Sequence, residues 1–327
     1  MTSSALLAAD KPATLNLSPG LADDVLRAAE HAQHARADNT RRSYARAWEQ
    51  WNAYAHEHGA CALPASPLVV AAYLAHLDKE GLGTSTMDIA LAAIVDRHRA
   101  ARLPLPTNDP VVRDVRAGIR ARRGIRPQGK AALGAYELHE MIDALPPDLS
   151  GLRDRALLLV GFGAALRRSE LVALHVAHVA WHARGIVVLV ARSKGDQEGR
   201  GVEVPIHAAP GPLCPVAALR AWLDAARIID GPIFRSVSRW GRVGLDALAS
   251  RHVAEVVKRA AKRVGLDPRV LAGHSLRAGF ATTAASVGAH MAEISRVTRH
   301  NSDGMLRRYI RAGTMFDRDP LRGVLAR

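Results

Sequence analysis

The chain is poor in cysteine, in lysine and in long apolar runs. Its two cysteines, Cys61 and Cys214, lie far apart and without the spacing of metal ligands, which argues against a disulfide framework and a zinc site. The longest apolar stretch, 156–166, is too short to span a bilayer, and the first residues lack the basic start and apolar segment of a signal peptide. We therefore expect a cytoplasmic protein without membrane contact, metal or cofactor.

The chain is instead rich in arginine. Lysine and arginine together number 45 against 31 acidic residues, which gives a net charge of +14, and only six of the 45 are lysines. Such a field attracts polyanions, and nucleic acid is the usual polyanionic partner of a protein of this type. Arginine also suits planar contacts with phosphate, although a GC-rich coding sequence would produce the same bias.

Four amphipathic helices are predicted before residue 124. In the first, aromatic residues recur at helical spacing, and Trp48 and Trp51 are expected to face a core. The third begins at Ser85, with Asp88 following at the spacing of a capping box. The last begins with Asp109 as a cap, followed by a proline. These segments together predict an all-helical module.

Arginines lie off the apolar stripes and give this module a basic side. A row of this kind is either a solvated face or a surface that contacts DNA phosphates, and the charge of the whole chain favours the second interpretation. The candidate DNA-binding residues are Arg41, Arg42, Arg46, Arg113, Arg116 and Arg120.

Glycine, proline and charge then interrupt the helical pattern. The expected organisation is a disordered tail over 1–20, a helical domain over 21–124, a linker over 125–132 and a second domain over 133–327. At 327 residues the chain is long enough for two domains that each bury a core.

The second domain is expected to be helical with one exception. Segments 246–264 and 276–287 predict helices. Segment 185–192 reads as a strand, and 201–206 reads as its partner in a hairpin whose turn holds Lys194. The predicted fold class is therefore mainly α with a small β-sheet, arranged as a helical domain and a mixed α/β domain.

A set of residues suited to attack on a phosphodiester follows in order along the chain. These are Arg167, Lys194, His274, Arg277, His300 and Tyr309. A tyrosine phenol can attack phosphorus and form an ester that conserves the bond energy for rejoining. Arginine binds the phosphate oxygens, histidine can take the phenolic proton, and lysine can protonate the leaving oxygen. This chemistry requires no metal.

The spacing within the set is compatible with one pocket. His274 and Arg277 are three residues apart and project from the same face of a helix. Glu170 lies three residues after Arg167, close enough to orient it. Arg168 is the alternative first arginine, but the pattern Leu-Arg-x-Ser-Glu-Leu favours Arg167. Each piece alone reads as an ordinary surface side chain, so the indication comes from their order, and the proton acceptor stays open between His274 and water.

The ordered set, with Gly273-His274-Ser275-Leu276-Arg277 at its centre, resembles that of the tyrosine recombinase, or phage integrase, family, and the Cre-like members in particular. Segment 39–48 also resembles the family's first DNA-binding helix, so the likeness covers nearly the whole chain. It implies a helical core-binding domain and a mixed catalytic domain that form a clamp around duplex DNA. A last helix within 315–327 would be donated to a neighbouring subunit.

The resemblance also implies the role of each residue. Tyr309 would be the nucleophile, Lys194 the general acid and Glu170 a supporting group. The residues that bind or activate the scissile phosphate would be Arg167, His274, Arg277 and His300. The implied partner is double-stranded DNA with an inverted-repeat site, cut through a 3′-phosphotyrosine by a homotetramer whose subunits are monomeric when free.

Two other functions remain open from the sequence alone. A DNA-binding regulator would keep the fold and lose cleavage. Such a protein is expected to lack the tyrosine or one of the two arginines, and this chain has all three. A topoisomerase of type IB would use the same chemistry as a monomer on nearly any supercoiled DNA. The Cre-like amino-terminal module favours the recombinase.

Overall fold

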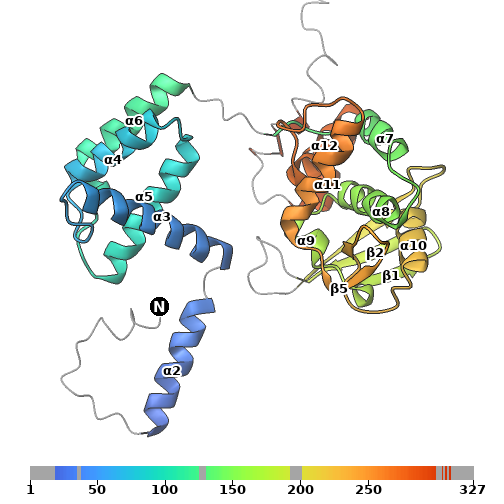
Figure 1. The fold of residues 1–327 in the computed structure, drawn as a ribbon, viewed down its shortest axis with the longest axis horizontal. Helices are drawn as coiled ribbons and strands as arrows, with labels where there is room; N and C mark the ends of the chain where they lie inside the picture. The colour runs from blue at the N-terminus through green and yellow to red at the C-terminus, as the bar shows by residue number, and fades with distance from the viewer. Residues whose placement is uncertain are drawn as a thin grey trace, which may run out of the picture. The chain divides into compact units, whose positions relative to one another are not determined.

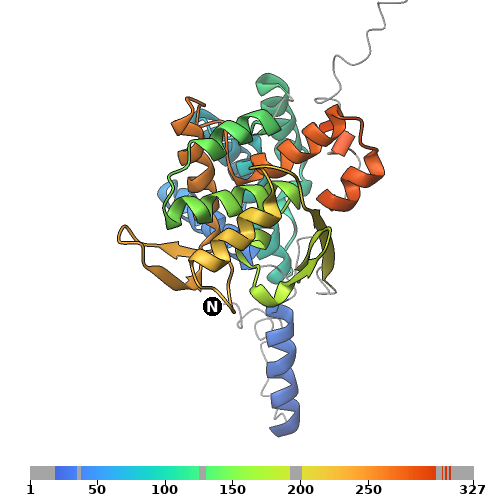
Figure 2. The same ribbon diagram turned by 90° about the vertical axis from the view of Figure 1, so that its right-hand side faces the viewer.

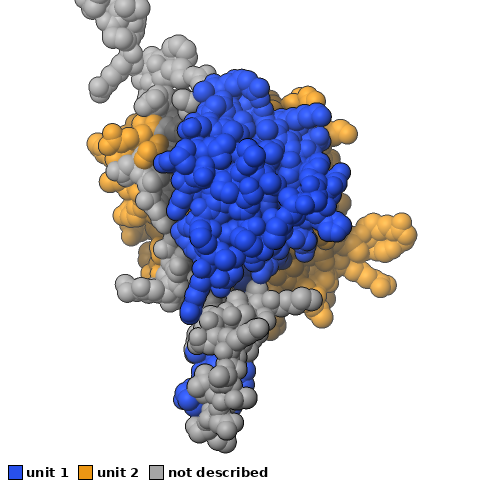
Figure 3. All heavy atoms as spheres, turned by 90° about the vertical axis from the view of Figure 1, so that its left-hand side faces the viewer, with its two compact units in different colours: residues 1–127 blue, residues 128–327 orange. Residues whose placement is uncertain are grey.

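The computed structural model describes residues 19–34, 38–124, 130–191, 201–299, 304, 306–307 and 309–310. The chain forms two compact units, Met1–Pro127 and Gln128–Arg327, which Figure 3 colours separately. Helices dominate both units, and small antiparallel sheets occur in the second, which confirms the predicted fold class (Figure 1). Within the described ranges, no helix is both long enough and apolar enough to cross a membrane. The predicted tail, most of the linker and the last helix fall largely or wholly outside these residues.

Unit 1 is helical throughout its described part. Trp51 and Ala55 are fully buried and Trp48 packs against the same cluster, so the predicted apolar stripe of the first helix is confirmed. The indole Nε1 of Trp51 donates to the carbonyl of Ala62 at 3.1 Å, which satisfies its one polar atom. The helices are α2 (Pro19–His34), α3 (Asp38–Glu57), α4 (Pro67–Lys79), α5 (Thr84–Ala100), the short 3-10 helix η1 (Pro106–Asn108) and α6 (Pro110–Arg123).

The predicted capping box at Ser85 is wrong. Helix α5 already begins at Thr84, with Gly83 as its N-cap, so Ser85 lies inside the first turn. The Asp88 carboxylate turns instead toward α6, where Arg116 and Arg120 each approach it to 2.7 Å. Two guanidiniums compete successfully with a backbone N–H because they bring full positive charge to the carboxylate.

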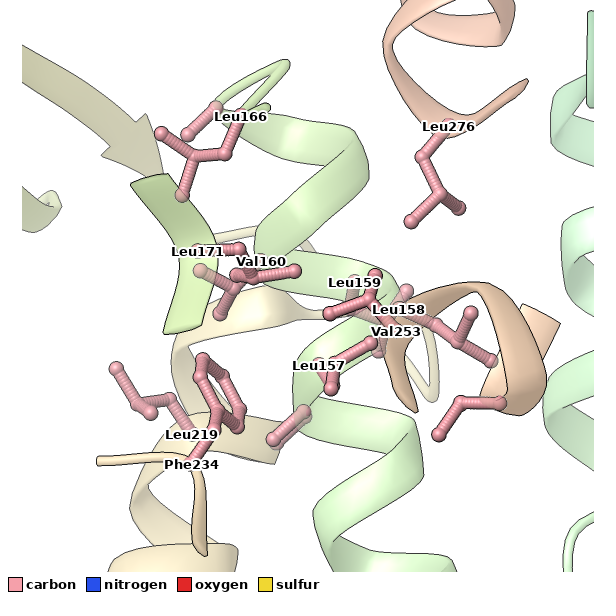
Figure 4. Packing of buried hydrophobic residues seen from close by; sticks show 14 of the residues in the cluster. Leu157, Leu158, Leu159, Val160, Leu166, Leu171, Leu219, Phe234, Val253 and Leu276 are labelled. Carbon is pink, nitrogen blue, oxygen red and sulfur yellow. The ribbon is translucent and has the colours of Figure 1, made fainter. Parts of the chain in front are cut away.

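Unit 2 is built around α8 (Leu149–Gly163), whose Leu157, Leu158 and Val160 are fully buried. Figure 4 shows these side chains between Val253 and Leu276 on one side and Leu219 and Phe234 on the other. Residues 156–161 of this helix are all buried and none is polar, which is typical of a helix segment at the centre of a domain. The surrounding helices are α7 (Ala135–Asp143), α9 (Arg168–Val172), α10 (Pro215–Ala225), α11 (Ser250–Arg263), α12 (Gly273–Ser286) and α13 (Met291–Thr298).

The larger sheet is antiparallel with the order β1-β2-β3, formed by Val179–His182, Gly185–Val190 and Val202–His207. Its register pairs Ile186 with Ile206 and Val188 with Val204, and all four side chains are buried, so the predicted hairpin is confirmed. The sequence pattern did not indicate β1, which pairs along the outer edge of β2.

The helix predicted over 246–264 is wrong at its start. Residues Val243–Ala247 form β5, which pairs with β4 (Arg235–Val237), and the hairpin extends away from the helices of this unit (Figure 2). The turn is closed by the Ser238 N–H, which donates to the Arg242 carbonyl at 2.8 Å, and by Gly241 at a φ of 74°. This local turn fixes the strand pair, and the helix begins only at Ser250.

Helix α12 approaches the start of unit 2 closely at Gly279. The Leu133 N–H donates to the Ser275 carbonyl at 3.1 Å, which brings the backbone of this segment onto the helix. A β-carbon on Gly279 would lie 1.7 Å from the Leu133 carbonyl oxygen, so no side chain fits there. Glycine at this position therefore sets the depth at which α12 lies in the unit.

We expect Gly279→Ala to destabilise unit 2 by about 3 kcal/mol, because the backbone of Leu133 cannot move away without losing its hydrogen bond. Gly118→Ala is the matched control: this glycine lies in α6 with no atom near its missing side chain, so alanine should stabilise unit 1 by roughly 1 kcal/mol. Thermal unfolding of both variants measures the two shifts. A Gly279→Ala protein as stable as the parent would contradict the close approach.

Candidate active site

The carboxyl end of α8 and the start of α9 place the first arginine. Between these helices Ala165 adopts a left-handed conformation with a φ of 47°, which turns the chain sharply before Arg167. Arg167 is the N-cap of α9, and its side chain is 25% exposed, whereas Arg168 is exposed. Of the two adjacent arginines, Arg167 is the one whose side chain is held in a cluster of charged groups.

Helix α12 supplies a histidine and the second arginine. A β-carbon on Gly273 would lie 2.3 Å from the side chain of Arg168, so any other residue at the start of the helix would require the Arg168 side chain to move. His274 is exposed, whereas Arg277 is 1% exposed, and the Arg277 Nη1 donates to the Ala165 carbonyl at 2.8 Å. This hydrogen bond fixes α12 against the turn that carries Arg167.

A buried carboxylate joins the arginines. Glu170 is 4% exposed and accepts the Arg167 backbone N–H at 3.0 Å and the Arg167 Nη1 at 2.5 Å. It also accepts the Arg299 Nη2 at 2.7 Å. Burying a carboxylate is expensive unless it is paired, and here both oxygens have cationic partners. The sequence-based expectation that Glu170 lies close enough to orient Arg167 matches this geometry.

Arg299 is the member of the cluster that sequence reasoning missed. It ends α13 in a left-handed conformation with a φ of 52° and a ψ of 47°, which costs a non-glycine residue roughly 1 kcal/mol. Its side chain is 9% exposed, and its carbonyl accepts the Arg167 Nη2 at 3.4 Å. Nothing in the sequence pattern distinguishes this arginine from a solvated one.

The cluster has more positive charge than its own carboxylate can neutralise. Three guanidiniums and one carboxylate leave two net positive charges among Arg167, Glu170, Arg277 and Arg299. Burial lowers the pKa of Arg277 to about 10, and the charges of Arg167 and Arg299 act in the same direction. Within the described part of the chain, the buried Nη2 of Arg277 and the Nε and Nη1 of Arg299 have no hydrogen-bond partner. Such a cluster favours an anion.

Tyr309 lies beside His274 at the edge of this cluster. The His274 Nε2 and the Tyr309 hydroxyl are 3.0 Å apart, although 35 residues separate them in the chain. The pKa of His274 is lowered mainly because the imidazole is partly buried. The positive charges of Arg277 and Arg167 lower this pKa further. A neutral imidazole at pH 7 can accept a proton from the phenol.

Two of the predicted site residues lie outside the part of the chain that the structure describes. These are Lys194 and His300; along the chain, β2 ends before the segment that holds Lys194 and β3 begins after it. In the described ranges, no group of three histidine, cysteine or acidic side chains is placed to hold a metal ion.

The predicted DNA-binding arginines of unit 1 fall into two groups. Arg42, Arg46 and Arg113 are exposed, and Arg41 is half-buried. In contrast, Arg116 and Arg120 both bind Asp88, as described above. Phosphate contacts by this second pair would have to compete with a carboxylate, which the sequence pattern did not indicate.

Comparison with known proteins identifies the family. The sequence profile of the phage integrase family matches residues 132–314, and that of the phage integrase N-terminal SAM-like domain matches residues 31–103. The chain is 38% identical over 296 residues to the integrase/recombinase xerD homolog of Selenomonas ruminantium, which covers 89% of this chain and 86% of the relative.

Solved structures share the fold at low sequence identity. The XerH site-specific recombinase bound to palindromic difH substrate superposes with a TM-score of 0.56 and 18% identity, over 80% of this chain and 72% of that one. The Tn1549 transposon integrase in complex with transposon right end DNA gives a TM-score of 0.56 and 13% identity, over 100% and 98% of the two chains. The integrase profile spans more than half of the sequence and the relative from Selenomonas nearly all of it, so the chain belongs to the phage integrase family and is a tyrosine site-specific recombinase.

Proposed function

We propose that this recombinase cuts and rejoins duplex DNA through a covalent bond between Tyr309 and a 3′-phosphate. The Tyr309 oxygen attacks phosphorus and gives its proton to His274, and the bond to the 5′-oxygen breaks. Lys194 gives a proton to the departing 5′-oxygen. The reverse reaction with the 5′-hydroxyl of another strand releases the tyrosine and completes the exchange.

The hydrogen bond between His274 and Tyr309 supports this proposal most directly. It puts a proton acceptor 3.0 Å from the phenol, which is within reach for general base catalysis. The lowered pKa of His274 keeps the imidazole neutral and able to accept. A tyrosine in an ordinary structural role would not need a neutral histidine beside buried arginines.

The arginines supply the charge that the reaction requires. The scissile phosphodiester brings one negative charge and the attacking phenolate brings another, and the buried cluster carries two net positive charges. Arg167 and Arg277 would bind the non-bridging oxygens, most strongly in the transition state. His300 would join them, and Glu170 would hold Arg167 in place.

The substrate would be a pair of inverted half-sites, and a homotetramer of subunits that are monomeric when free would hold two such sites together. The crystallised relative XerH was solved with a palindromic site, which is the arrangement expected here. Half-sites related by two-fold symmetry bind symmetric pairs of subunits, and two bound pairs make the tetramer.

We expect Tyr309→Phe to abolish covalent attachment to DNA while DNA affinity stays within about threefold, because only the attacking oxygen is lost. The protein is incubated with nicked fragments of its source genome, denaturant-stable adducts are captured, and the attached DNA is sequenced. Tyr136→Phe is the matched control, since this tyrosine of the same unit is 72% exposed and distant from the cluster in sequence.

Adducts at one inverted-repeat sequence that disappear only in Tyr309→Phe would establish the nucleophile and the target together. Adducts scattered over many sequences would point to a topoisomerase. Tight DNA binding without any adduct would point to a regulator, and adducts that persist in Tyr309→Phe would contradict the proposed nucleophile.

Arg277→Lys should lower the single-turnover cleavage rate at least about 100-fold, or some 3 kcal/mol, because lysine lacks the planar pair of donors. The Arg277 Nη1 binds the Ala165 carbonyl and its Nη2 has no partner among the described residues, so the guanidinium offers a separate nitrogen to a phosphate, whereas lysine has only one nitrogen for both. DNA affinity should change far less than the rate. A variant that cleaves as fast as the parent would remove Arg277 from the site.

The pH profile of cleavage should reveal His274. At subsaturating DNA the rate reports the free protein, so it should be constant near neutral pH and fall by half only below 6.5, the ordinary pKa of histidine. The rate should fall, not rise, at low pH, because a protonated His274 can no longer accept the proton of the Tyr309 phenol. His274→Gln should be slow and lack this acidic limb. An unchanged limb in that variant would assign the proton acceptor to another group.

A further inference from the structure

Arg299 contributes its charge to the cluster, but the reaction described so far gives its side chain no separate role. We propose that Arg299 is a positioning residue of the phosphate site: it shares the buried carboxylate of Glu170 with Arg167 and so leaves Arg167 oriented and available for the scissile phosphate. This inference rests on the proposed function, since it assumes that Arg167 binds that phosphate.

The contacts connect Arg299 to Arg167 in two ways. Through its side chain, Arg299 donates Nη2 to the same Glu170 oxygen that accepts the Arg167 backbone N–H. Through its backbone, the Arg299 carbonyl accepts the Arg167 Nη2 at 3.4 Å. Movement of Arg299 would therefore disturb Arg167 on both sides of its guanidinium.

Glu170 and the scissile phosphate are both anions that can bind Arg167, so it matters that Glu170 has a second cationic partner. A carboxylate and a phosphate both attract a guanidinium. If Arg167 were the only partner of Glu170, the carboxylate would therefore compete with the substrate phosphate for Arg167. A second cation on Glu170 reduces this competition. It also leaves the cluster with two net positive charges instead of one, which matches the charge of a phosphodiester under attack by a phenolate.

The backbone and the side chain of Arg299 have separate roles, which can be tested independently. Its φ of 52° and ψ of 47° suit glycine, so the turn after α13 does not need a side chain. The guanidinium that stands there is nevertheless buried, and burial lowers its pKa despite the neighbouring Glu170. Arg299→Gly can therefore remove the guanidinium while the backbone keeps its conformation.

The test is a double-mutant cycle of Arg299→Gly and Glu170→Gln. The nicked duplex recovered by adduct mapping is the substrate, and the single-turnover rate of adduct formation is measured well below the melting temperature of every variant. We expect Arg299→Gly to lower the rate about tenfold or more with DNA affinity unchanged. The double variant should lose less than the product of the two single losses, because both changes act on one shared contact.

Three results would overturn the proposal. A folded Arg299→Gly protein with the parental rate and a changed melting temperature would make Arg299 purely structural. Multiplicative losses in the double variant would mean that Arg299 acts independently of Glu170. An equal loss in Arg296→Gln, an exposed arginine of the same helix, would attribute the effect to overall charge.

A second probe separates failure of this inference from failure of the proposed function. If the parent protein forms no adduct on any DNA, the proposed function fails, and orthovanadate, a tetrahedral phosphate analogue that can become five-coordinate when bound, tests the cluster directly. Its affinity, measured by titration calorimetry, should fall about tenfold in Arg299→Gly, and the same non-additivity with Glu170→Gln is expected. Equal affinities in the parent and Arg299→Gly would overturn the inference independently of cleavage.

Discussion

The candidate active site depends on the buried carboxylate of Glu170. A carboxylate at 4% exposure is stable only with cationic partners, and the partners that reach it come from the start of α9 and the end of α13. Segments 129 residues apart are thereby held around one pair of oxygen atoms. The same contact concentrates positive charge where a phosphate would bind. The arginines that stabilise the buried carboxylate are therefore also the groups that would attract the phosphate.

The proposed nucleophile and the proposed phosphate-binding arginines pack against different hydrophobic clusters. Arg277 lies on the part of α12 whose Leu276 belongs to the large core around α8. Tyr309 packs instead against a small cluster of Ala281, Ala285, Ile294 and Leu306. A small cluster buries little apolar surface and is more easily rearranged than a large core. The position of the tyrosine is therefore set by weaker packing than that of the arginines, and its hydrogen bond to His274 links it to the start of α12.

The arginines of unit 1 show why charge alone does not identify a DNA contact. Arg116 and Arg120 share Asp88, and Arg122 and Arg123 both bind Asp78, so these cations stabilise the packing of α6 on its neighbours. Arg42, Arg46 and Arg113 are exposed. The net charge of +14 describes the attraction of the whole chain for a polyanion, and the distribution of carboxylates decides which arginines are free to act on it.

The sequence by itself determined the elements whose signals are local. Helical periodicity and the cap at Asp109 predicted α3, α4, α5 and α6 but not α2, and alternation predicted the pairing of β2 with β3. The types and order of the site residues indicated phosphodiester chemistry before any geometry was known. Only the tertiary structure decided that Asp88 binds α6, that β5 precedes α11, and that Arg299 is a buried partner of Glu170. These features depend on which distant segments meet, and periodicity along the chain carries no information about that.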